Sequence, residues 1–317
     1  MSDMHVRYPM LPPHNVLYTV SVLAERPDYN HRLMNVPAMW ESTKGANVRL
    51  AVLDTGVPAH VDISPIGGCA AKGIRSDQED RQGHGTHVAG IIAALAGNGI
   101  GVCGIAPDVD DYYIKVLDDD GSGTADAIVA GIHKAVDDYG VDIISMSLGV
   151  SAGAPRIREL EAACNYAVSN GVAVFAASGN DGARVSQPAV YDSVIAVGAI
   201  DSRKRKASFS NFGPQVDFVT GGVNVYSTHL DNSYASLSGT SMACPALAAV
   251  GALILSKHVA SGEKLSPAEL KEHIQRIAFD LGEKGRDVMF GDGVPVFGGE
   301  CLQSESWLAR LLNLFRR

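Results

Sequence analysis

Three short segments of the chain carry side chains that could together perform nucleophilic catalysis. The segment VLDTG places Asp54 directly after an apolar run, and GTSMACP carries Ser241. Between them, GHGTHVAG carries His84 and His87. A serine hydroxyl is a poor nucleophile at neutral pH, so an imidazole must take its proton and a carboxylate must hold that imidazole in the right tautomer. The segments supply each of these groups, although the chemistry alone leaves both histidines open as the base.

Apolar runs alternate with helical patterns and would position these side chains. Strands are expected at 48–53, 111–117, 141–148, 172–178 and 193–200. Helices are expected at 86–97, 124–140, 155–171, 241–258 and 266–278. Strands that alternate with helices predict an α/β fold whose parallel sheet is covered on both faces. In such a sheet the functional residues lie at the carboxyl ends of the strands, and Asp54 is expected to lie there.

The composition and charge exclude several classes of protein. The chain has 317 residues, of which 46% are hydrophobic, and a formal net charge of −9. These values support a sizeable core and disfavour nucleic acid or an anionic membrane as the main partner. The sequence shows no signal-peptide pattern at its start and no apolar run of about 18 residues, so no membrane span is expected.

The cysteines are few and scattered. None is part of a CxxC pair, so neither a zinc site nor a disulfide framework is expected, and a reducing, cytoplasmic compartment fits best. Cys244, three residues after Ser241, is expected to be a small core residue because no basic partner for a thiol nucleophile is evident. The five are Cys69, Cys103, Cys164, Cys244 and Cys301.

The motifs, taken together, resemble those of the subtilisin family of serine proteases. AVLDTG, GHGTHVAG, SMSLG, AASGN and GTSMACP follow that family's order, and the resemblance covers roughly residues 35–298. It implies a seven-stranded parallel sheet with helices on both faces and an endopeptidase that forms an acyl-enzyme on Ser241. It also selects His84 as the base, with Asp54 orienting it, and Asn180 as a side-chain donor to the developing oxyanion.

The resemblance further implies where a peptide or protein substrate would bind. An extended peptide would lie between two strands and add to them by backbone hydrogen bonds. The first specificity pocket would have its floor near Ser186, in VSQPAVY, where the absence of an acidic residue favours broad or apolar specificity. The strand residues are Gly121, Ser122 and Gly123 on one side and Ser147, Leu148 and Gly149 on the other.

A glycine-rich loop, LAGNGIGVCG at 95–104, resembles the family's calcium loop. The resemblance implies a structural Ca²⁺ ion held by backbone carbonyls, by an Asn side chain and by a carboxylate, which are the hard oxygen ligands that this ion prefers. The loop is one residue longer than expected, and one family ligand near the N-terminus has no obvious counterpart. The matching positions are Asp62, Leu95, Asn98, Ile100 and Val102.

The simplest division is an N-terminal extension at 1–30, a catalytic domain at 31–300 and a tail at 301–317. The short extension resembles that of intracellular subtilisins, in which such a segment lies across the active site, so 5–14 is an inhibitory candidate. The tail places apolar residues on one helical face, which could pack on its own domain or on a second copy in a homodimer. These residues are Trp307, Leu308, Leu311, Leu312 and Phe315.

Two alternatives remain open beside the protease. One is a catalytically silent or self-blocked homologue that acts as a binding scaffold, although the full set of Asp54, His84, Ser241 and Asn180 argues against it. The other is a peptide ligase on the same fold.

Overall fold

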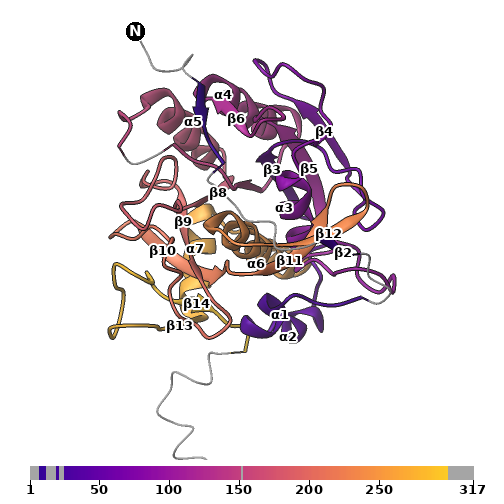
Figure 1. Cartoon of the computed structure of the whole chain (residues 1–317). Coiled ribbons are helices and arrows are strands. Elements are labelled where there is room, and N and C mark those ends of the chain that lie inside the picture. The colour runs from indigo at the N-terminus through magenta and orange to yellow at the C-terminus, as the bar shows by residue number, and fades with distance from the viewer. Residues whose placement is uncertain (1–6, 12–18, 21–24, 151–152, 299–317) are drawn as a thin grey trace, which may run out of the picture.

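The computed structural model describes residues 7–11, 19–20, 25–150 and 153–298 (Figure 1). Its centre is a seven-stranded parallel sheet in which the strands follow the order β10-β9-β8-β7-β3-β5-β4. The expected α/β fold is therefore confirmed. In chain order the strands are β3 (Arg49–Asp54), β4 (Gly67–Ala70), β5 (Asp110–Lys115), β7 (Ile143–Met146), β8 (Ala173–Ala177), β9 (Ile195–Ile200) and β10 (Val216–Gly221).

The central strands are continuous apolar runs because both of their faces are covered. Every residue of β7, β8 and β9 is buried, and β3 exposes only Arg49. A strand of this kind shows no alternation of polar and apolar residues. The five runs of the sequence match β3, β5, β7, β8 and β9. The pattern misses β4, whose sequence GGCA is only half-buried, and β10.

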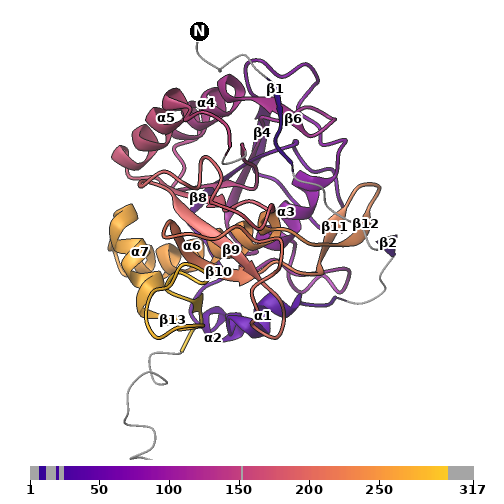
Figure 2. The ribbon, with the colours of Figure 1, turned by 60° about the vertical axis from the view of Figure 1, so that its left-hand side comes forward.

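Helices cover the two faces of the sheet (Figure 2). On one face, α3 (His84–Ala93) packs against α6 (Thr240–Ala260), and α6 also contacts α7 (Pro267–Arg276). On the other face, α4 (Ala125–His133), which continues into a π-helical turn (Lys134–Asp138), packs against α5 (Arg158–Ser169). A capping box between Ser266 and Glu269 starts α7, because each backbone N–H is bonded to the other residue's side chain.

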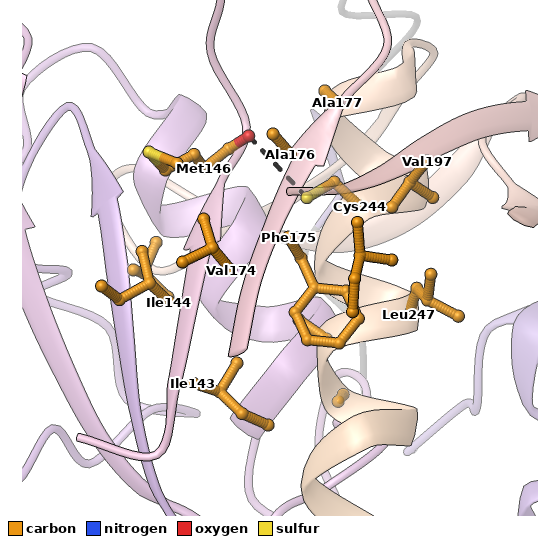
Figure 3. Close-up of a cluster of buried hydrophobic side chains, with 14 of the residues drawn as sticks. Ile143, Ile144, Met146, Val174, Phe175, Ala176, Ala177, Val197, Cys244 and Leu247 are labelled. Atoms are coloured by element: carbon orange, nitrogen blue, oxygen red, sulfur yellow. Dashed lines mark hydrogen bonds between the residues drawn. The ribbon is translucent and has the colours of Figure 1, made fainter. Parts of the chain in front are cut away.

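The core is centred on α6, which runs beneath the sheet from the candidate site to the far side of the protein. All its residues from Thr240 to Ser256 are buried, and Figure 3 shows Ile143, Phe175 and Val197 on the side of the sheet where Leu247 and Cys244 lie. This helix is long and apolar enough to cross a membrane, but 83% of its apolar window is buried inside the protein. A hydrophobic helix enclosed in this way is the core helix of a globular domain.

Smaller elements frame the sheet. Two short helices, α1 (Tyr29–Leu33) and α2 (Val36–Trp40), precede β3. The strands β11 (Val225–His229), β12 (Ser233–Leu237) and β2 (Thr19–Val20) form an antiparallel sheet. Two further antiparallel pairs are β1 (Arg7–Pro9) with β6 (Ser122–Thr124) and β13 (Ala278–Phe279) with β14 (Val294–Pro295).

Candidate active site

A buried carboxylate–imidazole pair lies where β3 ends and α3 begins. His84 Nδ1 is 2.8 Å from Asp54 Oδ1, and both side chains are only 1% exposed. Because a carboxylate only accepts, Nδ1 must carry the proton of the neutral ring, which leaves Nε2 as the basic nitrogen. Asp54 Oδ1 also accepts the backbone N–H of Thr55 at 2.8 Å. The pair therefore holds the imidazole in the tautomer that a general base needs.

The loop that presents His84 is anchored by Asp80, a residue that the sequence analysis did not single out. Its carboxylate accepts hydrogen bonds from the backbone N–H groups of Gly83 and Thr86 and from the hydroxyls of Thr86 and Thr55. Burial alone would raise the pKa of this carboxyl, but the hydrogen bonds outweigh it and hold the pKa below its ordinary value. Asp80 thus caps α3 as an ion. An Asp four residues before the histidine is the signal that could have revealed it.

Ser241 is the second residue of α6, and Asn180 lies beside it. Asn180 Oδ1 accepts the backbone N–H of Thr240 and its hydroxyl, each at 2.8 Å. The amide therefore turns its Nδ2 donors away from Thr240. A Cβ atom placed on Gly239 would come within 3.1 Å of Nδ2, so the glycine keeps the space beside the amide open. Ser241 itself is 3% exposed.

The two expected substrate strands lie on either side of the N-terminal segment. Tyr8 and Pro9 of β1 pair antiparallel with Gly123 and Ser122 of β6. On the other side, the backbone N–H of Gly149 donates to the carbonyl of Met10 at 3.2 Å. Met10 is 1% exposed, and the Leu11 side chain lies over Gly121. Figures 1 and 2 both show β1 against β6.

Ser186, the expected floor of the specificity pocket, lies close to Gly149 and Gly179. A Cβ atom on Gly179 would come within 2.5 Å of Ser186 Oγ, and one on Gly149 within 3.5 Å of its Cβ. Ser186 is 3% exposed, and its hydroxyl accepts a hydrogen bond from Asn211 at 3.3 Å. The fold therefore brings Ser186 next to Gly149, in the strand that is expected to bind substrate, and next to the segment that carries Asn180.

Comparison with known proteins agrees with this geometry. The model of the subtilase family matches residues 45–293. The chain belongs to the subtilase family. It is similar to subtilisin DY of Bacillus licheniformis, with 46% identity over 246 residues that cover 76% of this chain and 86% of that protein. It is also similar to subtilisin Savinase of Lederbergia lenta, with 42% identity over 251 residues that cover 79% of this chain and 89% of that protein.

A third relative is longer than this chain. The minor extracellular protease Epr of Bacillus subtilis (strain 168) shares 39% identity over 279 residues, which are 87% of this chain and 42% of Epr. The family and these relatives make this subtilase a serine endopeptidase, a hydrolase that acts on peptide or protein substrates.

The other histidine of the motif has a different environment in this subtilase. His87 is fully buried, and its Nε2 lies 3.1 Å from the carbonyls of both Val225 and Ala235. Two carbonyl partners require a proton on Nε2, so this nitrogen cannot act as a base. Burial, with a smaller effect of the neighbouring His84, lowers the pKa of His87 to about 3. His87 therefore joins α3 to β11 and β12 as a neutral ring.

Cys244 is a core residue, as expected. Its Sγ is buried against the end of β7, 3.7 Å from the carbonyl of Met146 and from Ser145 Oγ (Figure 3). Burial raises the pKa of this thiol to about 12. A thiol held in the protonated form is a poor nucleophile.

Asp62 is fully buried and contacts Leu95, Asn98 and Val102 of the other expected calcium ligands. Its carboxylate accepts from Asn98 Nδ2, from the backbone N–H of Val102 and from the hydroxyl of Tyr234. A Cβ atom on Gly101 would lie 2.0 Å from that hydroxyl, so the loop needs glycine there. Within the described residues no hydrogen bond reaches the carbonyls of Leu95, Ile100 or Val102.

This donor set fits a hard cation. The Asp62 carboxylate and three carbonyls that accept no hydrogen bond from the described residues are oxygen ligands of the kind that Ca²⁺ prefers. Glu25, which the sequence analysis missed, also contacts this loop. Its Oε2 accepts the backbone N–H groups of Gly97 at 2.8 Å and of Gly99 at 3.3 Å. No local pattern marks this residue because its contact with the loop spans more than 70 positions.

Proposed function

We propose that this subtilase cleaves peptide bonds through an acyl-enzyme on Ser241. The buried pair of Asp54 and His84, at the start of a helix that packs against α6, is the observation that supports it. His84 Nε2 takes the proton of the Ser241 hydroxyl as Oγ attacks the scissile carbonyl, and then gives that proton to the leaving amine. Water then attacks the acyl-enzyme: His84 takes a proton from the water and gives it to the Ser241 oxygen as the acyl group leaves.

The oxyanion that forms during this attack needs donors in fixed positions. The backbone N–H of Ser241 and Nδ2 of Asn180 take this role, since Thr240 holds the other end of the amide. Donors that are already oriented stabilise the developing charge without reorganising at the moment of reaction.

Replacing Ser241 tests the assignment. Ser241→Ala should abolish cleavage of a peptide substrate and labelling by a serine-directed fluorophosphonate, while the far-ultraviolet circular dichroism spectrum stays unchanged. A purified Ser241→Ala protein that still cleaves would exclude Ser241 as the nucleophile. A wild-type protein that binds peptides but is never labelled would instead favour the scaffold. Transfer of a peptide ester to an added amine in preference to water would favour the ligase.

We further propose that the segment around β1 inhibits the enzyme before it is processed. The support is its position: β1 occupies the edge of β6, and Met10 takes the N–H of Gly149 that a substrate backbone would use. A tethered segment has a high effective concentration, so even weak intrinsic affinity blocks the cleft. Two prolines, Pro12 and Pro13, follow in the sequence and lack the N–H groups that an extended substrate donates.

Calcium is proposed as a structural cofactor in the loop at 95–102. Asp62 and the carbonyls of Leu95, Ile100 and Val102 would hold the ion. Asn98, the remaining expected ligand, points its Nδ2 at Asp62, and its Oδ1 accepts the backbone N–H of Ile100 at 2.9 Å. The bound ion would neutralise the buried carboxylate and fix the loop against Tyr234.

Broad or apolar specificity and a cytoplasmic location complete the proposal. Ser186 at the expected pocket floor is small and uncharged, which supports the first. Free thiols at Cys69, Cys103, Cys164 and Cys244 support a reducing compartment. Mass-spectrometric mapping of cleavage sites in a denatured protein mixture tests the specificity, and immunoblotting of cell fractions tests the location.

A further inference from the structure

The second turn of α6 contains a proline. Pro245 lies four residues after Ser241 and inside the helix. An α-helical carbonyl normally accepts the N–H of the residue four positions later, and proline has no N–H. The carbonyl of Ser241 is therefore deprived of its helical donor, at the residue whose side-chain position matters most for catalysis.

The hydroxyl of Ser147 replaces that donor. Its Oγ lies 2.8 Å from the carbonyl oxygen of Ser241, and both groups are buried. A buried carbonyl without a partner is destabilising, so this bond stabilises the turn that carries the nucleophile. Ser147 comes directly after β7 and begins the strand that is expected to bind substrate.

A second hydrogen bond joins the end of β7 to α6, one residue before Ser147. Met146, the last residue of β7, accepts the thiol of Cys244 at 3.7 Å, again from the first turn of α6 (Figure 3). A thiol is a weak donor, so Ser147 provides the strong bond of the two. The strand that is expected to bind substrate and the nucleophile are thus joined by the Ser147 side chain, which bonds the backbone of Ser241 and not its hydroxyl.

We propose that Ser147 is a positioning residue, whose hydroxyl holds Ser241 in its reactive place because Pro245 leaves the Ser241 carbonyl without a donor. The inference rests on the proposed role of Ser241. Loss of the hydroxyl lets the first turn shift, and a small displacement of a nucleophile lowers the rate more than it lowers binding.

The test compares Ser147→Ala in two backgrounds. In the wild-type background we expect kcat to fall about five- to tenfold with KM within about twofold, as for the loss of one buried hydrogen bond. The rate of labelling by a small fluorophosphonate, which does not need the substrate strand, should fall in parallel. In a Pro245→Ala background the new N–H at 245 can donate to Ser241, so Ser147→Ala should then change kcat less than twofold.

Thr220→Val provides a matched control. The Thr220 hydroxyl donates to the carbonyl of Ala243 at 2.7 Å, also in α6 and also buried, but that carbonyl keeps the helical donor Leu247. Thr220→Val should leave kcat and the labelling rate unchanged.

Three outcomes overturn the inference. In the first, Ser147→Ala lowers kcat equally in both backgrounds. In the second, it raises only KM and leaves labelling intact, which would place its effect in substrate binding. In the third, Thr220→Val lowers kcat as much as Ser147→Ala. An active Ser241→Ala protein would overturn the proposed function instead, so the two failures are distinguishable.

Discussion

Thr240 fixes the amide of Asn180 from two sides, with its backbone N–H and its hydroxyl both donating to Oδ1 at 2.8 Å. Only one orientation of the amide satisfies both donors, and that orientation leaves Nδ2 as the group able to meet a new negative charge. The side chain is held in place before substrate arrives, which is the condition under which a single donor contributes most.

Asn180→Ala should therefore lower kcat about 10²- to 10³-fold with little change in KM, a range taken from the corresponding donor of subtilisin itself. Asn180→Asp keeps the shape but lacks the donors and should be at least as slow. Steady-state kinetics on a peptide substrate measure both, with Asn170→Ala at the exposed end of α5 as the control. An effect confined to KM would make Asn180 a binding residue.

His87 should make the protein sensitive to acid. Its pKa of about 3 in the folded protein lies below the ordinary value of 6.5, so the folded state resists protonation that the unfolded state accepts. The stability from this group is complete above pH 6.5 and is lost as pH falls toward 3, by about 1.4 kcal/mol per pH unit.

Urea unfolding between pH 7.5 and 4.5 measures this slope. His87→Gln should be less stable at pH 7.5 but should lose less free energy of unfolding on acidification than the wild type. Asp28 and Asp111, whose burial raises the pKa of each to about 6, contribute with the opposite sign, but they are present in both proteins and cancel in the comparison. Equal slopes would show that His87 does not determine the acid sensitivity.

Calcium should raise the melting temperature. An ion that binds only the folded state stabilises it in proportion to the logarithm of its concentration. Melting followed by circular dichroism should give a lower temperature in chelator and recovery with added Ca²⁺. Asp62→Asn should abolish this response, whereas Asp77→Asn, on an exposed loop, should keep it. A response that survives in Asp62→Asn would place the ion elsewhere.

Removing residues 1–24 should activate the enzyme. Glu25 and Asp28 remain in this shortened chain, so the contacts with the calcium loop and the cap of α1 are kept. The initial rate on a small peptide substrate should rise, and a synthetic peptide of residues 5–14 should lower it again by competing with substrate. Met10→Asp in the full chain should activate in the same direction, because a buried carboxylate weakens the segment's binding. Equal rates for the full and shortened chains would exclude inhibition.

The sequence predicted the elements whose local pattern is strong. Asp54 follows a continuous apolar run and Ser241 opens a long apolar helix, so the sequence alone places both at the ends of elements. The sequence did not predict β4 because GGCA shows neither a continuous apolar run nor an alternation of polar and apolar residues. The place of β4 in the sheet depends on its pairing with β5. Asp80, Glu25 and the hydroxyl of Ser147 act through contacts between distant segments, which no window along the chain contains.

The order of the parts along the chain has a consequence for synthesis. Asp54 ends β3, the first strand of the central sheet to be translated, and His84 opens α3 soon after it. Ser241 opens α6, which is translated much later and packs against β7, β8, β9 and β10. Contacts of such long sequence separation form late in folding. A nascent chain that ends before residue 240 therefore lacks Ser241, and we expect proteolytic activity only after α6 is translated and docked. Until then the growing chain cannot digest itself or its neighbours on the same polysome.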